Sequence, residues 1–218
     1  MNTFDIHSVI GILRQEVTRW QSPAVTIVSQ REGDPFKVLV SCLLSLRTQD
    51  TTTGPASVRL FALASTPEQM MLLSRDEIEL AIYPVGFYRN KAGQIIEICR
   101  QLVEKFNGRV PDEIDSLLQF KGVGRKTANL VVTLGFGKPG ICVDTHVHRI
   151  CNRWGYLATR TPAETEKALR DKLPAEYWLE INDLLVTYGQ NLCRPISPYC
   201  SICRIAEFCN RCGVTNFR

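Results

Sequence analysis

The sequence lacks several features that would place it outside the ordinary globular proteins. No uninterrupted apolar stretch reaches membrane-spanning length, so we expect no membrane helix. The N-terminal segment has no basic leader followed by an apolar run, which predicts a cytoplasmic rather than a secreted protein. Glycine (14) and proline (11) show no collagen or linker bias, and 44% hydrophobic residues exclude a disordered chain. The 218 residues suit one large domain or two small ones.

Apolar–polar alternation with a period of two is also absent, whereas helix signals are frequent. Apolar residues recur at helical spacing from Ile6 to Trp20, and again from Ala92 until Asn107-Gly108 stops the pattern. A further helix is predicted from Glu176 to Gln190. Four more segments open with capping residues. Asp34-Pro35 supplies an N-cap and a first-turn proline, and Thr161-Pro162 with Glu164 opens another helix. Thr66-Pro67 with Gln69 and Ser74 with Glu77 are predicted capping boxes, in which the two side chains cap each other's backbone amides. The predicted fold class is therefore all-α.

The net charge of +4 is small, but its distribution is uneven. Residues 120–154 contain one acidic residue, Asp144, and a larger set of basic ones: Lys121, Arg125, Lys126, Lys138, Arg149 and Arg153. Lysine and arginine at phosphates release counterions, so a basic segment on a near-neutral chain favours a polyanionic partner. From charge alone, a solvated basic face explains the segment equally well.

Two glycines flank one apolar residue in Gly122-Val123-Gly124, between two predicted helices. Glycine permits a tight turn and lets another backbone approach closely, and the N–H groups that open the second helix attract a phosphate. This pattern is the helix-hairpin-helix signature, which binds the DNA backbone without reading its sequence. An ordinary helix–helix turn with a C-terminal glycine is the alternative, and the adjacent Arg125 argues against it.

Two residues near this turn are candidates for catalysis. Lys126 stands just inside the second helix, where the positive end of the helix dipole and Arg125 favour a neutral, nucleophilic amine. Asp144 immediately precedes another predicted helix, so its first interpretation is a helix N-cap. The sequence pattern alone leaves the role of Asp144 open.

The nine cysteines fall into two groups. Four lie in apolar runs and are predicted to fill the core: Cys42, Cys99, Cys142 and Cys151. The others cluster near the C-terminus, which in a cytoplasmic protein indicates a metal rather than disulfides. Cys193, Cys200, Cys203 and Cys209 have the spacing C-x6-C-x2-C-x5-C, while Cys212 could replace Cys193 in a rival set. Four thiolates bind zinc or an iron–sulfur cluster, and spacing does not decide between them.

The joint occurrence of these motifs resembles the endonuclease III family of helix-hairpin-helix DNA glycosylases, of the iron–sulfur type. The resemblance is carried by GVGRKTANLVVTLGFGKPGICVDTHVHRICNR and the C-x6-C-x2-C-x5-C spacing, and it extends over nearly the whole chain. It implies a base-excision-repair glycosylase that removes oxidised pyrimidines through a Schiff base and nicks abasic DNA by β-elimination. The alternatives are the same mechanism on another lesion, such as a mismatched or deaminated pyrimidine or abasic sites only, and a non-enzymatic DNA-binding iron–sulfur module.

The resemblance also implies roles for individual residues. Lys126 matches the nucleophilic lysine and Asp144 the essential aspartate. Phe87 matches an intercalating leucine, and Arg47 stands where many members have a gap-filling glutamine, for which Gln49 is a possible substitute. The implied DNA-backbone contacts are Gly122, Val123, Gly124 and Arg125. The implied ligands of a [4Fe-4S] cluster are Cys193, Cys200, Cys203 and Cys209, with Cys212 a bystander.

The expected architecture follows from the same resemblance. Residues 28–138 would form a six-helix barrel domain containing the hairpin, and residues 1–27 with 139–218 a second helical domain carrying the cluster. Damaged double-stranded DNA would lie across the cleft between them, with Lys126 and Asp144 at its mouth. We expect a monomer without membrane association, located in the cytoplasm of a prokaryotic cell and associated with the nucleoid.

Overall fold

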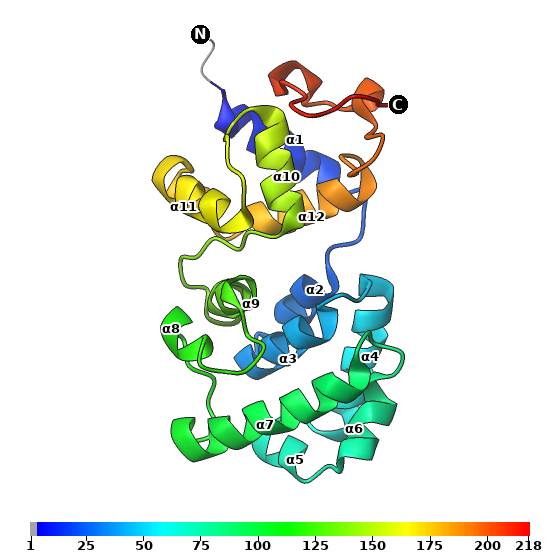
Figure 1. The fold of residues 1–218 in the computed structure, drawn as a ribbon, viewed down its shortest axis with the longest axis vertical. Coiled ribbons are helices and arrows are strands. Elements are labelled where there is room, and N and C mark those ends of the chain that lie inside the picture. The colour runs from blue at the N-terminus through cyan, green and yellow to red at the C-terminus, as the bar shows by residue number, and fades with distance from the viewer. Residues whose placement is uncertain (1–3) are drawn as a thin grey trace. The chain divides into compact units, whose positions relative to one another are not determined.

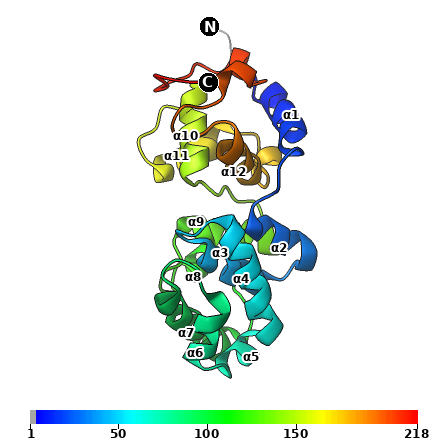
Figure 2. The ribbon, with the colours of Figure 1, turned by 90° about the vertical axis from the view of Figure 1, so that its right-hand side faces the viewer.

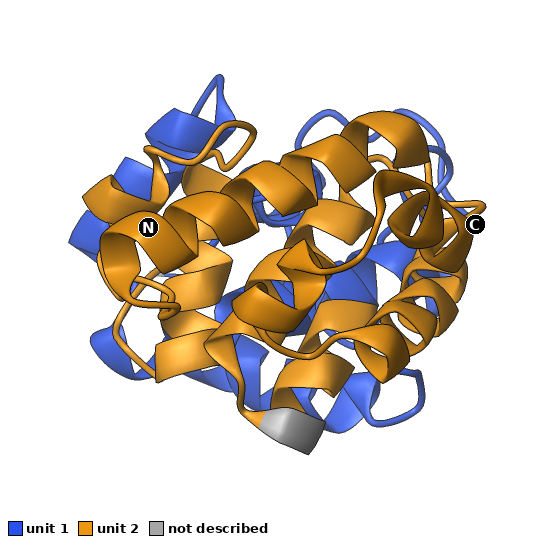
Figure 3. Ribbon diagram, turned by 90° about the horizontal axis from the view of Figure 1, so that it is seen from below, with its two compact units in different colours: residues 1–23, 141–218 blue, residues 24–140 orange. Residues whose placement is uncertain are grey.

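A computed structural model describes residues 4–218, apart from the side chains of Arg31 and Glu32. Across that range the fold is all-helical without a strand, which confirms the predicted class (Figure 1, Figure 2). Residues 1–3, with which the expected segment 1–27 begins, lie outside the described residues. The chain divides into residues 24–140 and residues 1–23 with 141–218 (Figure 3), where boundaries at 28 and 138 were expected.

The unit of residues 24–140 is built around one buried helix, α3 (Pro35–Ser45), which packs against several other elements of the unit. Its sequence is apolar on nearly all sides, as a helix surrounded by others must be. Asp34 caps it by accepting a hydrogen bond from the Phe36 amide at 2.8 Å, as predicted. The other elements are α2 (Ala24–Glu32), α4 (Asp50–Leu63), α5 (Pro67–Met71), α6 (Arg75–Ile82), α7 (Tyr88–Phe106), α8 (Ile114–Leu117), α9 (Arg125–Leu130) and the π-helix η1 (Val131–Gly135).

Local capping signals place the ends of several of these helices. Ser74 and Glu77 form the predicted reciprocal capping box at the start of α6. At the start of α5, Thr66 accepts from the Gln69 amide, but the Gln69 side chain accepts from the Ser65 amide instead of closing the box. The second half of that predicted box is therefore wrong, because the preceding residue offers the glutamine another donor. Helix α7 ends at a left-handed asparagine (φ 52°), residue 107, where the sequence pattern stops.

The unit of residues 1–23 and 141–218 joins the two ends of the described chain. Helix α12 (Ile181–Asn191) packs against both α1 (Ile6–Val17) and α10 (Thr145–Trp154), and their apolar faces form one core. Figure 1 shows α1 beside these C-terminal helices. The remaining elements are α11 (Pro162–Lys172) and the short 3-10 turns η2 (Ala175–Tyr177), η3 (Cys200–Ile202) and η4 (Ala206–Phe208).

The helix predicted from Glu176 to Gln190 is wrong at its start. A 3-10 turn covers Ala175–Tyr177, and α12 begins only at Ile181. The indole N–H of Trp178 donates to the Leu173 carbonyl at 2.9 Å, and Tyr177 is buried. These two aromatic side chains hold the chain in a 3-10 turn, and a continuous α-helix through this segment would move them out of these contacts.

None of the described helices is long and apolar enough to cross a membrane. The four cysteines predicted for the core are buried, namely Cys42, Cys99, Cys142 and Cys151, whereas the four of the proposed metal set are only partly buried.

Candidate active site and metal centre

The glycine hairpin joins α8 to α9 and is fixed from beneath by aromatic packing. Gly122 has a positive φ of +85°, a conformation that residues with a Cβ rarely adopt. Val123 is buried, and its amide donates to the Phe120 carbonyl at 3.0 Å. The Phe120 ring packs edge-on against Phe106 of α7, with 5.7 Å between ring centres. The apolar middle residue of the turn therefore points into the core, and the two glycines lie outside it.

Gln94 of α7 secures the same turn from the side. Its amide nitrogen donates to the Lys121 carbonyl, and a Cβ on Gly122 would collide with its side chain. Gly124 is the N-cap of α9, and a Cβ there would meet no atom within 4 Å. The surface above the first amides of α9 is therefore open, and such amides have no acceptor within their own helix. Close approach of a phosphate is sterically possible here.

Lys126 is the second residue of α9 and is exposed to solvent. Its neighbour Cys42 lies in the buried helix α3. Burial raises the pKa of Cys42 to about 12, and the charge of Lys126 acts in the opposite direction. The lysine therefore stands at the contact between α3 and α9, with the hairpin directly before it.

Asp144 is the N-cap of α10, as its position in the sequence predicts. Its Oδ1 atom accepts hydrogen bonds from the amides of His146 at 2.8 Å and Val147 at 3.0 Å. The residue is 9% exposed, so the capping bonds hold a nearly buried carboxylate in one orientation. Asp144 belongs to the unit of residues 1–23 and 141–218, and Lys126 to the unit of residues 24–140.

Arg47 and Phe87, far apart in sequence, are brought together by the fold. Both have left-handed backbones, with φ of 53° and 58°, which is uncommon for residues other than glycine. Phe87 is 60% exposed, and the Arg47 guanidinium lies 5.8 Å from its ring centre. Gln49 is exposed at the start of α4, and its side chain makes no capping hydrogen bond. Strained, exposed residues of this kind concentrate at functional sites.

The basic segment 120–154 does not form one solvated face. Arg153 is 9% exposed and Arg149 is half-buried; both turn toward the tail of residues 193–212. Lys138 forms an ion pair with Asp112 at 2.6 Å. The exposed basic residues beside the hairpin are Lys121, Arg125 and Lys126. The interpretation of all six basic residues as one patch is wrong, because two of them satisfy main-chain carbonyls inside the other unit.

The four cysteines of the C-x6-C-x2-C-x5-C spacing line one pocket, together with residues of α10 and α12. Cys212 does not line it and is exposed. Burial is the main cause that raises the pKa of the Cys200 and Cys203 thiols, and it raises that of Cys209 to about 11; the neighbouring thiols add to each shift. Thiols that raise one another's pKa in this way release their protons when a cation binds.

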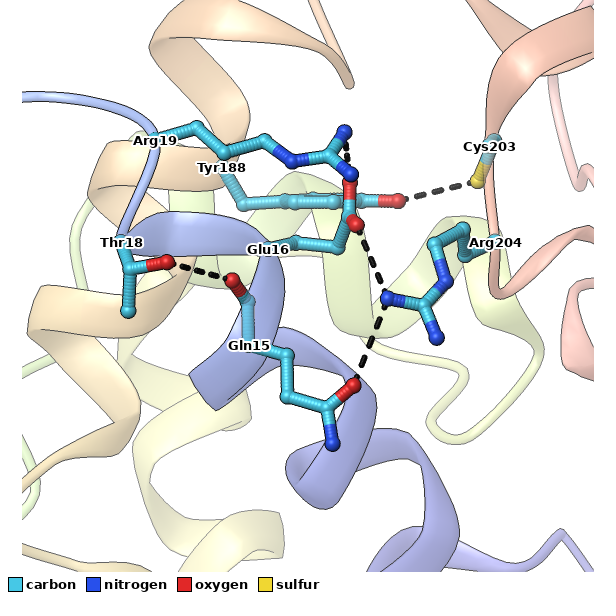
Figure 4. A network of polar contacts seen from close by, with 7 residues as sticks. All are labelled: Gln15, Glu16, Thr18, Arg19, Tyr188, Cys203 and Arg204. Atoms are coloured by element: carbon cyan, nitrogen blue, oxygen red, sulfur yellow. Dashed lines mark hydrogen bonds and ion pairs between the residues drawn. The ribbon is translucent and has the colours of Figure 1, made fainter.

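Several donors point at these sulfur atoms. The Tyr188 hydroxyl lies 2.9 Å from Cys203 Sγ (Figure 4), and burial raises the pKa of this tyrosine. The Arg153 guanidinium lies 3.6 Å from Cys193 Sγ, while its two terminal nitrogens each donate at 2.6 Å to carbonyls of residues 194 and 195. Both Tyr188 and Arg153 come from helices beneath the tail. Among the described residues, no three His, Cys, Asp or Glu side chains converge on a site for a single metal ion.

Further contacts fasten the tail to the rest of its unit. The backbone amide of Cys212 donates to the Arg153 carbonyl at 3.0 Å, while the Cys212 thiol is exposed to solvent. Arg204 contacts Glu16 of α1 at 3.2 Å (Figure 4). Glu16 is 1% exposed and also pairs with Arg19 at 3.4 Å, so its buried carboxylate is compensated by two arginines.

Sequence reasoning missed three residues of these sites: Lys91, Arg153 and Tyr188. Lys91 continues the apolar stripe of α7, four residues before Ile95, and a lysine on a core-facing stripe is the signal that would have found it. Arg153 belongs to the basic segment 120–154, where its charge predicts exposure rather than burial. Tyr188 has no local sequence signal, because its partner Cys203 lies in a different segment.

Comparisons with known proteins agree with this geometry. Residues 40–175 match the model of the HhH-GPD superfamily base excision DNA repair proteins. The chain is 48% identical over 181 residues to endonuclease III of Thermotoga maritima, covering 83% of this chain and 85% of that protein. Identity to endonuclease III of Escherichia coli is 37%, over 81% of this chain and 84% of that protein.

Solved structures give the same result. A trapped covalent intermediate of endonuclease III with DNA superposes with a TM-score of 0.77 at 37% identity, covering 82% of this chain and 84% of that chain. A thermostable thymine-DNA glycosylase shares the fold, with a TM-score of 0.74 at 22% identity over 94% of this chain and 98% of that chain.

Proposed function

The chain belongs to the HhH-GPD superfamily of base excision DNA repair proteins, within its endonuclease III family, and we propose that Lys126 and Asp144 perform its chemistry. It is a bifunctional enzyme: a DNA glycosylase for oxidised pyrimidines and a lyase for abasic sites. The observation that carries the assignment of the nucleophile is the exposed amine of Lys126, held directly behind the Gly122-Val123-Gly124 hairpin. A hairpin that binds the DNA backbone would bring this amine to a sugar.

In the proposed reaction, the Lys126 amine attacks C1′ of the damaged nucleotide. The bond between C1′ and the base breaks, and its electron pair leaves with the base, which takes up a proton. The nitrogen then forms a double bond to C1′ as the C1′–O4′ bond breaks, and O4′ takes up a proton as the sugar ring opens. The resulting imine makes the C2′ proton acidic; its removal drives β-elimination, which breaks the bond from C3′ to the 3′ phosphate oxygen. Asp144, oriented by its two capping bonds, stabilises positive charge at C1′ and accepts the proton lost by the amine.

A base inside a duplex is out of reach, so the nucleotide must first leave the stack, at a cost of a few kcal/mol. We assign this step to Phe87 and Arg47, which are adjacent, exposed and held in left-handed conformations. The phenyl ring separates the neighbouring bases, and the guanidinium occupies the space that the base vacates. Gln49 offers a second polar side chain on the same loop for the opposite strand.

The cysteine tail is the proposed site of a [4Fe-4S] cluster, held by Cys193, Cys200, Cys203 and Cys209. Two observations support this ligand set: these four thiols share one pocket, and Cys212 lies outside it with its backbone engaged elsewhere. In a cubane each thiolate binds a different iron, so the sulfurs need not converge as they do around a single zinc ion. Bound there, the cluster would order the loop-rich tail.

The proposed partner is damaged double-stranded DNA, bound by a monomer. Support comes from the open hairpin surface and from the solved endonuclease III–DNA complexes that superpose on this chain. We place the protein in the cytoplasm of a prokaryotic cell, beside the nucleoid where its proposed DNA substrate lies; bacterial endonucleases III are among the relatives.

A panel of duplexes, each with one defined lesion, tests the proposed function. Base release and strand nicking are scored separately for oxidised pyrimidines, mismatched or deaminated pyrimidines, and preformed abasic sites. We expect release and nicking at oxidised pyrimidines and nicking at abasic sites. Release from mismatched pyrimidines alone would favour another lesion, and no reaction on any duplex would favour a DNA-binding module without catalysis.

A further inference from the structure

Lys91, in the first turn of α7, is 5% exposed, which is rare for a lysine. Its ammonium group donates to the Leu44 carbonyl at 2.9 Å, the Leu46 carbonyl at 2.6 Å and Thr48 Oγ1 at 3.2 Å. All three acceptors are uncharged oxygens. Burial lowers the pKa of Lys91 to about 8. A buried cation without a carboxylate among these acceptors is costly, so the fold retains it for a geometric reason.

The acceptors surround Arg47. Leu46 and Thr48 are its two neighbours in the chain, so the ammonium group holds the main chain before this left-handed residue and the side chain after it. The same lysine lies one helical turn after Phe87, and its own amide donates to the Phe87 carbonyl at 3.0 Å. Lys91 therefore connects directly to both loops that carry the exposed, strained residues.

A second link joins the loops at Gly86. Its amide donates to Thr48 Oγ1 at 3.1 Å, so this hydroxyl accepts from both Gly86 and Lys91. A Cβ at Gly86 would lie 2.8 Å from the Arg47 carbonyl oxygen, closer than real Cβ atoms approach. The two loops are thus in van der Waals contact, bridged by one hydroxyl and one ammonium group.

We propose that Lys91 is a positioning residue that locks residues 46–48 and 85–88 into one rigid element, so that Arg47 and Phe87 enter the duplex together. This inference rests on the proposed function and names a further residue that serves it. Left-handed conformations persist only where the surroundings hold them, and Lys91 supplies that restraint from inside the unit. Arg47 and Phe87 together form the wedge. A preorganised wedge loses less conformational freedom on entering the duplex than two independently moving loops would.

A simpler account is that Lys91 only satisfies the last carbonyls of α3. The two accounts differ in which reaction step they affect. A preformed abasic site has no base to extrude, so a wedge-positioning residue matters for excision from paired lesions and little for nicking at abasic sites. A residue that only stabilises the fold affects both reactions equally.

The test compares Lys91→Met, which keeps the length of the side chain and removes its donors, with wild type. Excision of a paired lesion should slow by about tenfold or more, since misplacing a positioned group by about 1 Å costs up to 10²-fold. Nicking at a preformed abasic site and covalent trapping there should stay within about twofold, a change of roughly 0.4 kcal/mol. A 2-aminopurine next to the lesion should show reduced base extrusion on binding.

Two further variants keep the test decisive. Leu102→Ala removes a buried side chain from the same helix, away from both loops, and is the control for a general loss of stability. Its rates of lesion excision and of abasic-site nicking should change together. Thr48→Val removes the shared hydroxyl at little cost in volume and should show the Lys91→Met pattern in weaker form. If Lys91→Met does not fold, the Thr48→Val variant provides the test instead.

A mutant cycle with the combined Arg47→Ala and Phe87→Ala variant asks whether the lysine acts through these two side chains. Adding Lys91→Met to that variant should cost little further excision activity, because both groups that the lysine positions are already missing. Additive losses, or equal losses on paired lesions and abasic sites, would overturn the inference while the proposed function stands. A wild-type protein that neither excises lesions nor nicks abasic DNA would refute the proposed function itself.

Discussion

Replacing Asp144 by asparagine separates its role as a helix cap from its role in catalysis. Asparagine keeps the Oδ1 acceptor that binds the amides of His146 and Val147, and Asp and Asn cap helices about equally well. The loss of the charge at the positive end of α10 should lower the free energy of unfolding by less than about 1 kcal/mol. Turnover should fall by about 10²–10³-fold, the usual cost of removing one group that stabilises transition-state charge.

The assay measures denaturant unfolding and single-turnover excision on the same preparations. Asp144→Ala is the matched comparison: it removes both the cap and the charge, and should cost about 1 kcal/mol of stability, with a range of roughly 0.5–2. An asparagine variant with wild-type turnover would show that Asp144 is only a cap. An asparagine variant as unstable as the alanine variant would show that asparagine does not replace the cap here, and a fall in its turnover would then not separate catalysis from capping.

Three further predictions concern the metal, the hairpin and the wedge. Purified protein should contain about four iron and four sulfide per chain. Cys212→Ser should leave the iron content unchanged, and Cys203→Ser should lower it. Stoichiometric zinc in place of iron would contradict the cluster assignment. Arg125→Ala should weaken binding to damaged and undamaged duplexes alike and make the log–log salt slope less negative by about 0.9, whereas an unchanged slope would mean that Arg125 contacts no phosphate. Phe87→Ala should slow excision from paired lesions far more than nicking at abasic sites, and equal losses would exclude a wedge.

Much of the helical framework could be predicted because its signals are local. Asp34 before Pro35 and the Ser74–Glu77 box mark the starts of α3 and α6, and each acts within one helical turn. The break between residues 175 and 181 could not be predicted in this way. It depends on Trp178 donating to Leu173 and on the burial of Tyr177, which tertiary packing decides.

The residues of the candidate site also divide into those with a local sequence signal and those placed by tertiary packing. The spacing of the cysteines and the glycine hairpin are visible in the sequence, because each motif occupies one short segment. The direction of the basic side chains is not visible, because charge in a sequence does not show which way a side chain points: Arg153 points inward to carbonyls of the tail. The link from Lys91 to both neighbours of Arg47 spans more than forty residues of sequence and appears only in the fold.

The most direct test of the central claim is covalent capture of Lys126 on an abasic site. With borohydride present, wild-type protein should form a stable adduct with abasic DNA, and mass analysis should place the adduct on Lys126. Lys126→Gln keeps similar bulk without the amine, so trapping and nicking should vanish while binding to damaged DNA persists. If Lys126→Gln still nicks abasic DNA and is trapped by borohydride, another amine is the nucleophile and the catalytic assignment is wrong.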